Sequence, residues 1–239
     1  MKNKKFVLSI LLSSVYMVCG AAPTKSMLAT DLTRIDEGDD PVLPDGIVAV
    51  EYIESTGTQY INTGIPYNSY TDEINCTIEV TEVVKYGYVF GCNENINGGT
   101  RYFAVRRLQN YDRWQFLGAS NISSLEELYL NTTYHIRISP QYKGSFINDY
   151  YFNSSYSDNY VYTRPLYLLA VNNIVDAAFK NKAKLYHYSH LREGETIIDL
   201  IPVRVEDDYS NDFGAMYDLV SGELFLNQGT GSFIIGPDL

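Results

Sequence analysis

The sequence has few of the residues from which metal centres are built, and it lacks the motifs of several enzyme classes. It contains three histidines and no Cys/His cluster of the kind that binds zinc. His187 and His190 are three residues apart on a predicted strand, which directs their side chains to opposite faces. There is no Gly-x-Ser-x-Gly motif and no glycine-rich phosphate loop that leads into a helix. The sequence therefore argues against a zinc site and gives no support to a serine hydrolase or a nucleotide-binding protein.

Positive charge is also scarce. The chain has 18 Lys and Arg against 29 Asp and Glu, which gives a formal net charge of −11, and loss of Lys2, Lys4 and Lys5 with a signal segment would change −11 to −14. Nucleic acid and anionic membranes repel such a chain, so nucleic acid is not an expected partner. The residue in excess is tyrosine, with 22 copies. Tyrosine suits exposed β faces and surfaces that stack on sugars.

The first residues are typical of an export signal. A basic start is followed by the apolar run Phe6–Val18 and by the small residues Gly20 and Ala21, so we predict a signal peptide at residues 1–21. The apolar run is shorter than the about 20 residues of a membrane-spanning helix. The residues before Cys19 do not match a lipobox. We expect an exported protein at the cell surface, in the periplasm or outside the cell, without membrane insertion once the signal is removed.

The rest of the chain divides into a linker and one domain. Residues 22–46 are acidic and lack periodicity, which predicts a flexible linker. From residue 47 onward, short alternating runs are separated by turn residues, as in adjoining antiparallel strands. Ser123–Tyr129 and Val175–Phe179 could each form a helical turn. We predict an all-β domain over residues 47–239, which is about the size of one large sandwich.

Two cysteines follow the signal segment. Cys76 and Cys92 each lie at an apolar position of an alternating run, so both thiols should point into the core. The second run would place Tyr86 and Tyr88 on the same core face as Cys92. If the two runs form a hairpin centred near Val84, the cysteines are cross-strand neighbours. An oxidising compartment would then join them in a disulfide, and two free buried thiols are the alternative.

Motifs near both ends of the domain resemble a known family. Leu43-Pro-Asp-Gly46 leads into Glu51-Tyr-Ile-Glu-Ser-Thr-Gly-Thr-Gln-Tyr-Ile61, and Tyr217-Asp218 precedes Ser-Gly and Gly-Thr-Gly turns. The chain resembles the concanavalin A-like lectin/glucanase superfamily, and within it the LamG-like jelly-roll modules of secreted and surface proteins from gut bacteria and phages. The resemblance implies a two-sheet antiparallel jelly-roll sandwich. One family motif usually has an arginine where this chain has Ile198. Any salt bridge that the arginine forms elsewhere in the family is therefore not expected here.

The motif residues have a structural explanation that needs no ligand. Glycines such as Gly229 supply turn backbone that β-branched residues resist. We expect Asp218 and Asn227 to hold turns through hydrogen bonds between side chain and backbone. These motifs therefore predict a scaffold and leave the activity open.

The sequence contains no motif that indicates a glycoside hydrolase active site. Jelly-roll glucanases carry acidic residues at alternate positions of one strand, so that two carboxylates project from one face. No strand here has that pattern, and Glu79 and Glu82 lie at opposite parity. A divergent glycoside hydrolase therefore remains only as an alternative.

Two acidic segments contain hard oxygen ligands of the type that calcium accepts. One contains Asn93 and Glu94, and the other contains Asp207, Asp208 and Asp212. LamG-like modules often bind calcium at one rim, which the resemblance carries over as a weak expectation. Neither segment has a fixed ligand spacing, so we expect no cofactor other than, at most, calcium.

The main candidate for ligand binding is one strand face. If neighbouring apolar residues face the core, then Tyr102, Arg106, Arg113 and Gln115 face outward. An aromatic ring beside planar hydrogen-bonding groups can stack on a sugar and bind its hydroxyls. An ordinary solvated face is the alternative. Trp114, the single tryptophan, shares its parity with the apolar positions and is expected in the core.

The sequence as a whole predicts an exported, non-catalytic binding module for a glycan or another surface component. A structural protein of the envelope or of an extracellular assembly is the second hypothesis. The sequence does not determine the oligomeric state.

Overall fold

The computed structural model describes residues 42–96, 99–107, 112–118, 122–139, 144–148, 150–152, 160–173, 176–206 and 211–239. The predicted signal peptide at residues 1–21, and the predicted linker as far as residue 41, lie outside the described residues. Leu43–Leu239 forms one compact unit, which begins before the boundary predicted at Ile47. Gly46 belongs to this unit, because its carbonyl accepts a 2.9 Å hydrogen bond from the Glu206 amide. The described part of the chain has no helix that is long and apolar enough to cross a membrane.

The described residues form two β-sheets. The eleven-stranded sheet contains β1 (Ile47–Ala49), β2 (Ile53–Thr56), β4 (Asp72–Val80), β9 (Thr133–Ser139), β10 (Gly144–Ile147), β11 (Tyr150–Phe152), β15 (Lys182–Arg192), β16 (Glu195–Glu206), β17 (Asp212–Asp218), β18 (Leu224–Phe225) and β19 (Ile234–Ile235). The eight-stranded sheet contains β3 (Ile61–Asn68), β5 (Tyr88–Ile96), β6 (Gly99–Arg107), β7 (Arg113–Leu117), β8 (Ile122–Glu127), β12 (Val161–Leu168), β13 (Val171–Asn173) and β14 (Asp176–Ala178). Pairing is antiparallel except between β13 and β5, which are parallel.

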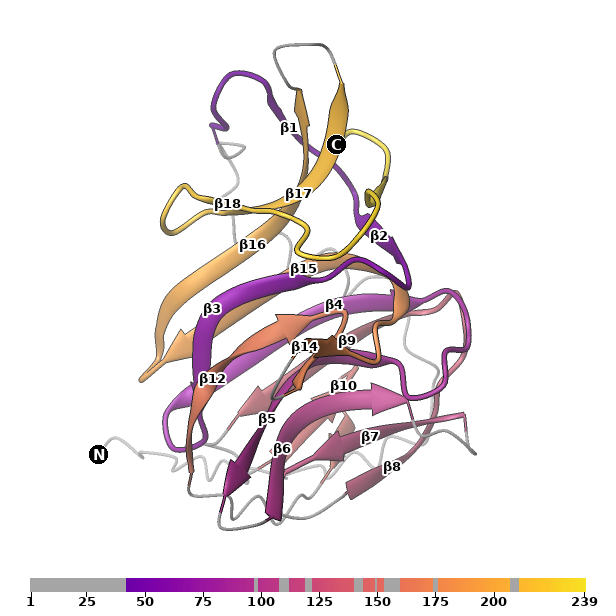
Figure 1. The fold of residues 1–239 in the computed structure, drawn as a ribbon, viewed down its shortest axis with the longest axis vertical. Helices are drawn as coiled ribbons and strands as arrows, with labels where there is room; N and C mark the ends of the chain where they lie inside the picture. Colours follow the sequence, from indigo (N-terminus) through magenta and orange to yellow (C-terminus); the bar gives the residue numbers. More distant parts are fainter. Residues whose placement is uncertain are drawn as a thin grey trace, which may run out of the picture. The chain divides into compact units, whose positions relative to one another are not determined.

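The two sheets pack face to face as a sandwich, and the chain's alternating apolar residues fill the space between them (Figure 1). Ile74 and Ile78 of β4 point into this core, because successive strand residues point to opposite faces. From the other sheet, Phe103 stacks on Tyr67 with 3.6 Å between ring centroids. Trp114 is fully buried, as predicted. The predicted all-β, two-sheet antiparallel sandwich is therefore confirmed.

The chain passes repeatedly from one sheet to the other. Strand β3 of the eight-stranded sheet is followed by β4 of the eleven-stranded sheet, and β4 lies between β9 and β15, which are distant in sequence. The consecutive strands β5 to β8 form one edge of the smaller sheet. These crossings are the connections of a jelly roll.

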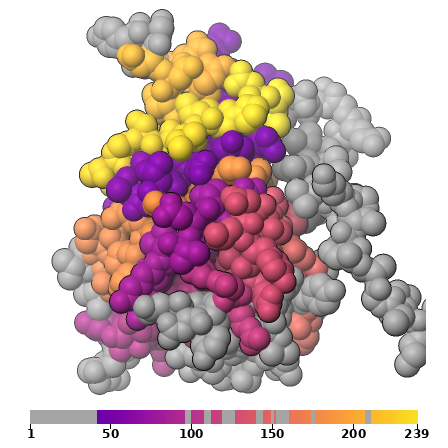
Figure 2. Space-filling view, turned by 90° about the vertical axis from the view of Figure 1, so that its right-hand side faces the viewer, coloured from indigo at the N-terminus to yellow at the C-terminus, as the bar shows by residue number. Residues whose placement is uncertain are grey.

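The two ends of the domain lie side by side. Strand β19 pairs with β2, and Figure 2 shows the yellow C-terminal segments against the indigo N-terminal ones. The Gln59 amide links them, because its Nε2 donates a 2.9 Å hydrogen bond to the Ser232 carbonyl. At Gly229 an added Cβ would lie 1.9 Å from the Thr58 carbonyl oxygen, so only glycine permits this approach.

The two residues predicted to hold turns do so. Asp218 accepts hydrogen bonds from the Val220 amide at 3.2 Å and from the Ser221 amide at 3.1 Å. Asn227 accepts from the Gly229 amide at 2.8 Å and donates to the Gly231 carbonyl at 2.8 Å. The closing motif of the family resemblance therefore has a structural role in this chain.

The two predicted helical turns are wrong. Ile122–Glu127 is strand β8, which pairs with β7 through Gln115 and Ser123. Asp176–Ala178 is strand β14, which pairs with β13. Both are edge strands, where the available hydrogen bonds of the neighbouring strand outweigh a weak local preference.

The predicted hairpin of Cys76 and Cys92 is also wrong. Cys76 lies on β4 opposite Ile136, whereas Cys92 lies on β5 opposite Phe103, so the two cysteines belong to different sheets. Both thiols point into the core, as predicted, but they are free and buried. The chain crosses between the sheets after β4, which replaces the predicted turn near Val84.

Candidate functional site

The outer face of the eight-stranded sheet, turned away from the core, carries the residues that the sequence indicated for glycan binding. Tyr102 and Arg106 lie on β6, and Arg113 and Gln115 lie on β7. The intervening apolar residues face the core and are at most 2% exposed: Phe103, Val105, Trp114 and Phe116. The predicted alternation of these two strands is therefore confirmed. Tyr102, Arg106 and Arg113 are partly exposed, whereas Gln115 is buried on the outer side.

Arg106 is held in place by its neighbours on this face. Its Nε donates to Gln115 Oε1 at 2.8 Å, and its Nη1 donates to the Tyr88 hydroxyl at 2.8 Å. Its Cζ lies 5.4 Å from the ring centroids of both Tyr86 and Tyr88, within the range of cation–π attraction. Its Nη2 meets no acceptor among the residues that the structure describes. The guanidinium is thus oriented in advance and keeps donors for a ligand.

Tyr88 supports this arrangement although the sequence placed it in the main core. A β-bulge lies between Tyr88 and Phe90, so Val89 and Phe90 both pack in the main core while Tyr88 points outward, opposite Arg106. The side chain is only 2% exposed. Burial raises the pKa of the Tyr88 hydroxyl, against the lowering effect of Arg106, and the nearby Tyr102 and Tyr86 raise it further. The hydroxyl therefore stays protonated near neutral pH.

A small apolar cluster forms the floor of this face. Tyr88, Ala104, Leu117 and Val171 are buried together, and Tyr86 and Tyr102 pack against them. Beside Ala104 the chain has Gly91, where an added Cβ would lie 2.3 Å from the Ala104 Cβ. The small residues Gly91 and Ala104 therefore lie low in the sheet surface, and the rings of Tyr86 and Tyr102 lie beside them.

The aromatic surface continues towards β12 and β14. Phe179, which is 47% exposed, lies 5.6 Å from the Tyr86 ring and 5.7 Å from the Tyr88 ring, measured between centroids. Tyr167 is opposite Gly91 on the same outer side, and its ring packs against that of Tyr60 with 4.9 Å between centroids and an interplanar angle of 30°.

Two lysines stand over this surface. Lys85 Nζ lies 5.5 Å from the Tyr86 ring centroid, and Lys180 Nζ lies 5.5 Å from that of Tyr60. We call the whole set the tyrosine face: Tyr60, Tyr86, Tyr88, Tyr102, Tyr167, Phe179, Lys85, Arg106, Gln115 and Lys180.

Of the four predicted ligand-binding residues, Tyr102, Arg106 and Gln115 belong to the tyrosine face. Sequence reasoning missed its other members for two reasons. The bulge at Val89 reverses the side of the sheet on which Tyr86 and Tyr88 lie. No residue type in this segment indicates a bulge. Phe179 has a φ of 52° and follows an edge strand that the sequence assigned to a helical turn.

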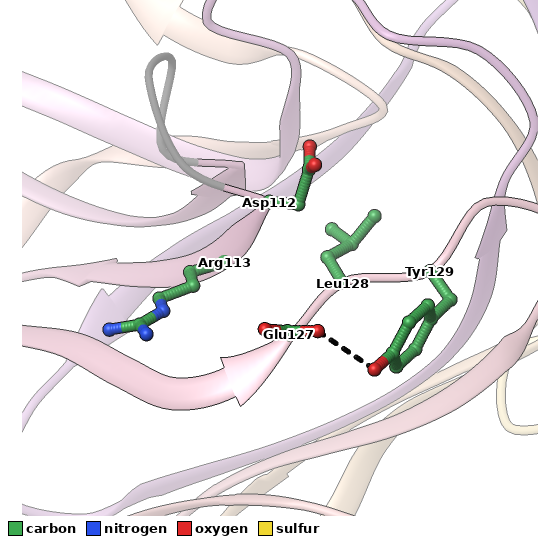
Figure 3. Close-up of a pocket in the computed structure, with 5 residues that line it drawn as sticks. All are labelled: Asp112, Arg113, Glu127, Leu128 and Tyr129. Carbon is green, nitrogen blue, oxygen red and sulfur yellow. Dashed lines mark hydrogen bonds between the residues drawn. The ribbon is translucent and has the colours of Figure 1, made fainter.

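Arg113 lies at a different place, beside a hollow of about 250 Å³ at the ends of β7 and β8 (Figure 3). Figure 3 shows its guanidinium pointing away from Tyr129. Tyr129 donates a 2.8 Å hydrogen bond to Glu127, and Asp112 is paired with Arg107. Arg113 therefore borders a separate polar hollow and does not extend the cluster around Arg106.

The calcium candidate Glu94 is occupied by protein hydrogen bonds. One oxygen accepts from the Tyr160 hydroxyl at 2.7 Å, and the other accepts from the Thr163 amide, from the Thr163 hydroxyl at 2.7 Å and from the Arg164 amide at 2.9 Å. Burial acts to raise the pKa of Glu94, but these donors lower it below its ordinary value. Its neighbour Asn93 donates to Asn173 at 2.7 Å on the outer face. Glu94 and Asn93 thus do not converge on one ion.

The second calcium segment is only partly described. Asp207 and Asp208 lie outside the described residues, and Asp212 lies 3.3 Å from Arg204 in an ion pair. The residues that the structure describes contain no group of three or more His, Cys, Asp or Glu that could hold a metal ion.

Comparison with known proteins finds matches among solved structures. No protein-family model matches the chain, and a search of curated proteins finds no significant match. The chain is similar to a structure described as a putative carbohydrate binding protein from Bacteroides ovatus, with a TM-score of 0.51, 12% identity, and coverage of 80% of this chain and 60% of that one. A mutant of Trypanosoma rangeli sialidase with trans-sialidase activity gives a TM-score of 0.41, 14% identity, and coverage of 54% and 23%. The chain thus spans less than two thirds of either protein.

Proposed function

We propose that this protein is an exported, non-catalytic module that binds a glycan on its tyrosine face. The observation that carries the proposal is the geometry of Arg106, whose guanidinium is fixed by Gln115 and Tyr88 and flanked by aromatic rings. Saccharide recognition uses this combination, because rings stack on sugar C–H faces and oriented donors bind hydroxyls.

Further support comes from the fold. The Bacteroides ovatus structure has a related architecture, and its description names carbohydrate binding. The predicted signal peptide supports a location where extracellular glycans occur. An envelope or surface protein partner is the second candidate, and a divergent glycoside hydrolase is the third.

The hydrolase alternative has little support on this face. Glycoside hydrolysis uses two carboxyl groups on either side of the scissile bond. Two described carboxylates belong to strands that adjoin this face, Glu94 on β5 and Asp176 on β14. Glu94 is held by four donors, and Asp176 accepts from the Ala177 amide at 2.7 Å. Among the described residues of this face, no two carboxylates lie opposite each other.

A glycan array tests the proposal directly. The wild-type domain should bind a restricted set of glycans, and Tyr102→Ala should weaken that binding because it removes a partly exposed ring. The matched control is Tyr70→Ala, which truncates a 55% exposed tyrosine at the turn between β3 and β4. Equal loss in both variants, or no glycan binding by the wild type, would contradict the proposal.

A further inference from the structure

The cations of the eleven-stranded sheet have carboxylate partners that the three cations of the tyrosine face lack, although Arg107 elsewhere on the eight-stranded sheet is paired with Asp112. Each described lysine or arginine of the eleven-stranded sheet has a carboxylate partner: Arg137 with Glu73, Lys182 with Glu82, Lys184 with Glu79, Arg192 with Asp72, and Arg204 with Glu206, Asp212 and Asp238. On the tyrosine face, Lys85, Arg106 and Lys180 have no carboxylate partner among the described residues. Because acidic residues outnumber basic ones 29 to 18 in this chain, unpaired cations are not expected from composition.

These three cations all stand against aromatic rings. Lys85 and Arg106 lie 5.5 and 5.4 Å from the Tyr86 ring centroid. Lys180 lies 5.5 Å from the Tyr60 ring centroid and donates to the Ala177 carbonyl at 3.3 Å. Rings hold a cation in place without neutralising its charge, so the positive potential remains available to a ligand.

Burial raises the pKa of Tyr60 and the charge of Asp176 helps to raise it, so Asp176 lies near the Lys180 end of the face, but it forms no ion pair with Lys180. Asp176 accepts from the Ala177 amide, whereas Lys180 donates to the Ala177 carbonyl. Glu94 is held by four donors from Tyr160, Thr163 and Arg164. The tyrosine face, as defined above, therefore contains three cations and no carboxylate, on a chain in which acidic residues are in excess.

We propose that the glycan bound by the tyrosine face carries carboxylate groups, as a chain of uronic acids does. This inference rests on the proposed function and names its ligand class. The planar guanidinium of Arg106 matches a planar carboxylate through paired N–H donors. Lys85 and Lys180 add charge on two sides, and the tyrosine rings take the sugar faces.

Isothermal titration with matched probes tests this class. The wild-type domain should bind a short oligogalacturonate about tenfold more tightly than its fully methyl-esterified form, the scale of one charge-assisted hydrogen bond. High ionic strength should reduce this difference, because salt screens exposed charges. Poly-glutamate, which has carboxylates but no sugar rings, should bind weakly.

A charge-deleted variant makes the test specific to this face. The triple variant Lys85→Gln, Arg106→Gln, Lys180→Gln should bind the acid and the ester equally, because it removes all three cations that would meet the carboxylates. The control Lys182→Gln removes the same kind of charge from a lysine already paired with Glu82, and it should keep the preference.

The outcomes separate the two proposals. Equal binding of the acid and the ester by the wild type, or retention of the preference by the triple variant, overturns the carboxylate assignment and leaves glycan binding in place. Tighter binding of dextran sulfate or of poly-glutamate than of oligogalacturonate also overturns it. If the wild type binds no glycan at all, the proposed function fails as well.

Discussion

Arg106 and Tyr88 face each other across β5 and β6, and the Arg106 Nη1 donates a 2.8 Å hydrogen bond to the Tyr88 hydroxyl. The tyrosine is 2% exposed, so it serves as a support while the guanidinium remains partly accessible. This pair links the floor of the tyrosine face to its proposed binding surface. It also gives the first prediction.

Tyr88→Phe should weaken glycan binding without unfolding the domain. The change removes the acceptor for Arg106 Nη1 and leaves the ring in its cluster, so the guanidinium loses one of its two side-chain anchors. We expect a loss of about 1–3 kcal/mol in binding free energy, measured by titration with the best glycan from the array. Unchanged affinity would show that the hydroxyl does not orient Arg106.

Truncation of a core side chain should lower the stability of the domain, whereas truncation of an outer-face side chain should not. Trp114→Ala should lower the free energy of unfolding by about 3–5 kcal/mol, because it removes a fully buried side chain. Tyr102→Ala, on the outer face, should leave that free energy nearly unchanged. Urea denaturation of both variants measures the difference. Similar destabilisation by the two changes would place Tyr102 in the core.

A buried acidic group should make stability depend on pH. Asp72 is fully buried and accepts 2.8 Å hydrogen bonds from Arg192 and His190. Burial acts to raise its pKa, but Arg192, His190 and the Asn68 amide lower it well below the ordinary value. A lowered folded-state pKa contributes stability above the unfolded value of about 3.9 and loses it as the pH falls below that value.

The matched variant for this effect is Asp72→Asn. At neutral pH it should lower the free energy of unfolding by about 1–3 kcal/mol, because Arg192 and His190 then lose a carboxylate acceptor. Its loss of stability between neutral pH and about pH 3 should be shallower than in the wild type. Urea titrations at both pH values measure this, and parallel wild-type and variant profiles would exclude Asp72 as the main source.

The two cysteines should behave as inert thiols. Burial raises the pKa of both Cys76 and Cys92 above the ordinary range of a thiol, and the structure has them free. Ellman's reagent should therefore react slowly with the folded domain and rapidly with two thiols per chain, Cys76 and Cys92, in denaturant. A domain without thiols in denaturant would show a disulfide instead.

Calcium removal should change neither stability nor glycan binding. Glu94, the best described of the calcium candidates, is held by donors from Tyr160, Thr163 and Arg164. We expect the same melting temperature and the same affinity with EDTA and with added calcium. A calcium-dependent rise in either quantity would direct attention to the segment that contains Asp207 and Asp208.

Alternation along single strands was predictable from the sequence. The face of each residue on β6 and β7 follows from period-two geometry, so Trp114 could be assigned to the core and Tyr102 and Arg106 to the outer side. The turn roles of Asp218 and Asn227 were predictable too, because short polar side chains form hydrogen bonds with nearby backbone groups.

Relations between strands were not predictable in the same way. The bulge beside Val89 moves Tyr88 to the outer face through one extra residue, and its cause lies in pairing with β6. Likewise Cys76 and Cys92 lie on different sheets because the chain crosses the sandwich after β4. Local pattern carries no information on which distant strand will supply the hydrogen bonds.

The sequence by itself thus determined an all-β sandwich, its buried tryptophan, its turn residues and the outward direction of Tyr102 and Arg106, since these depend on residue type and strand period. Only the tertiary structure decided that Tyr60, Tyr86, Tyr167, Phe179 and Lys180 join them on one face. Those residues come from separate strands and turns, and sheet pairing over long sequence distances brings them together. The same pairing gave the cations of the other sheet their carboxylate partners and left Lys85, Arg106 and Lys180 without one among the described residues.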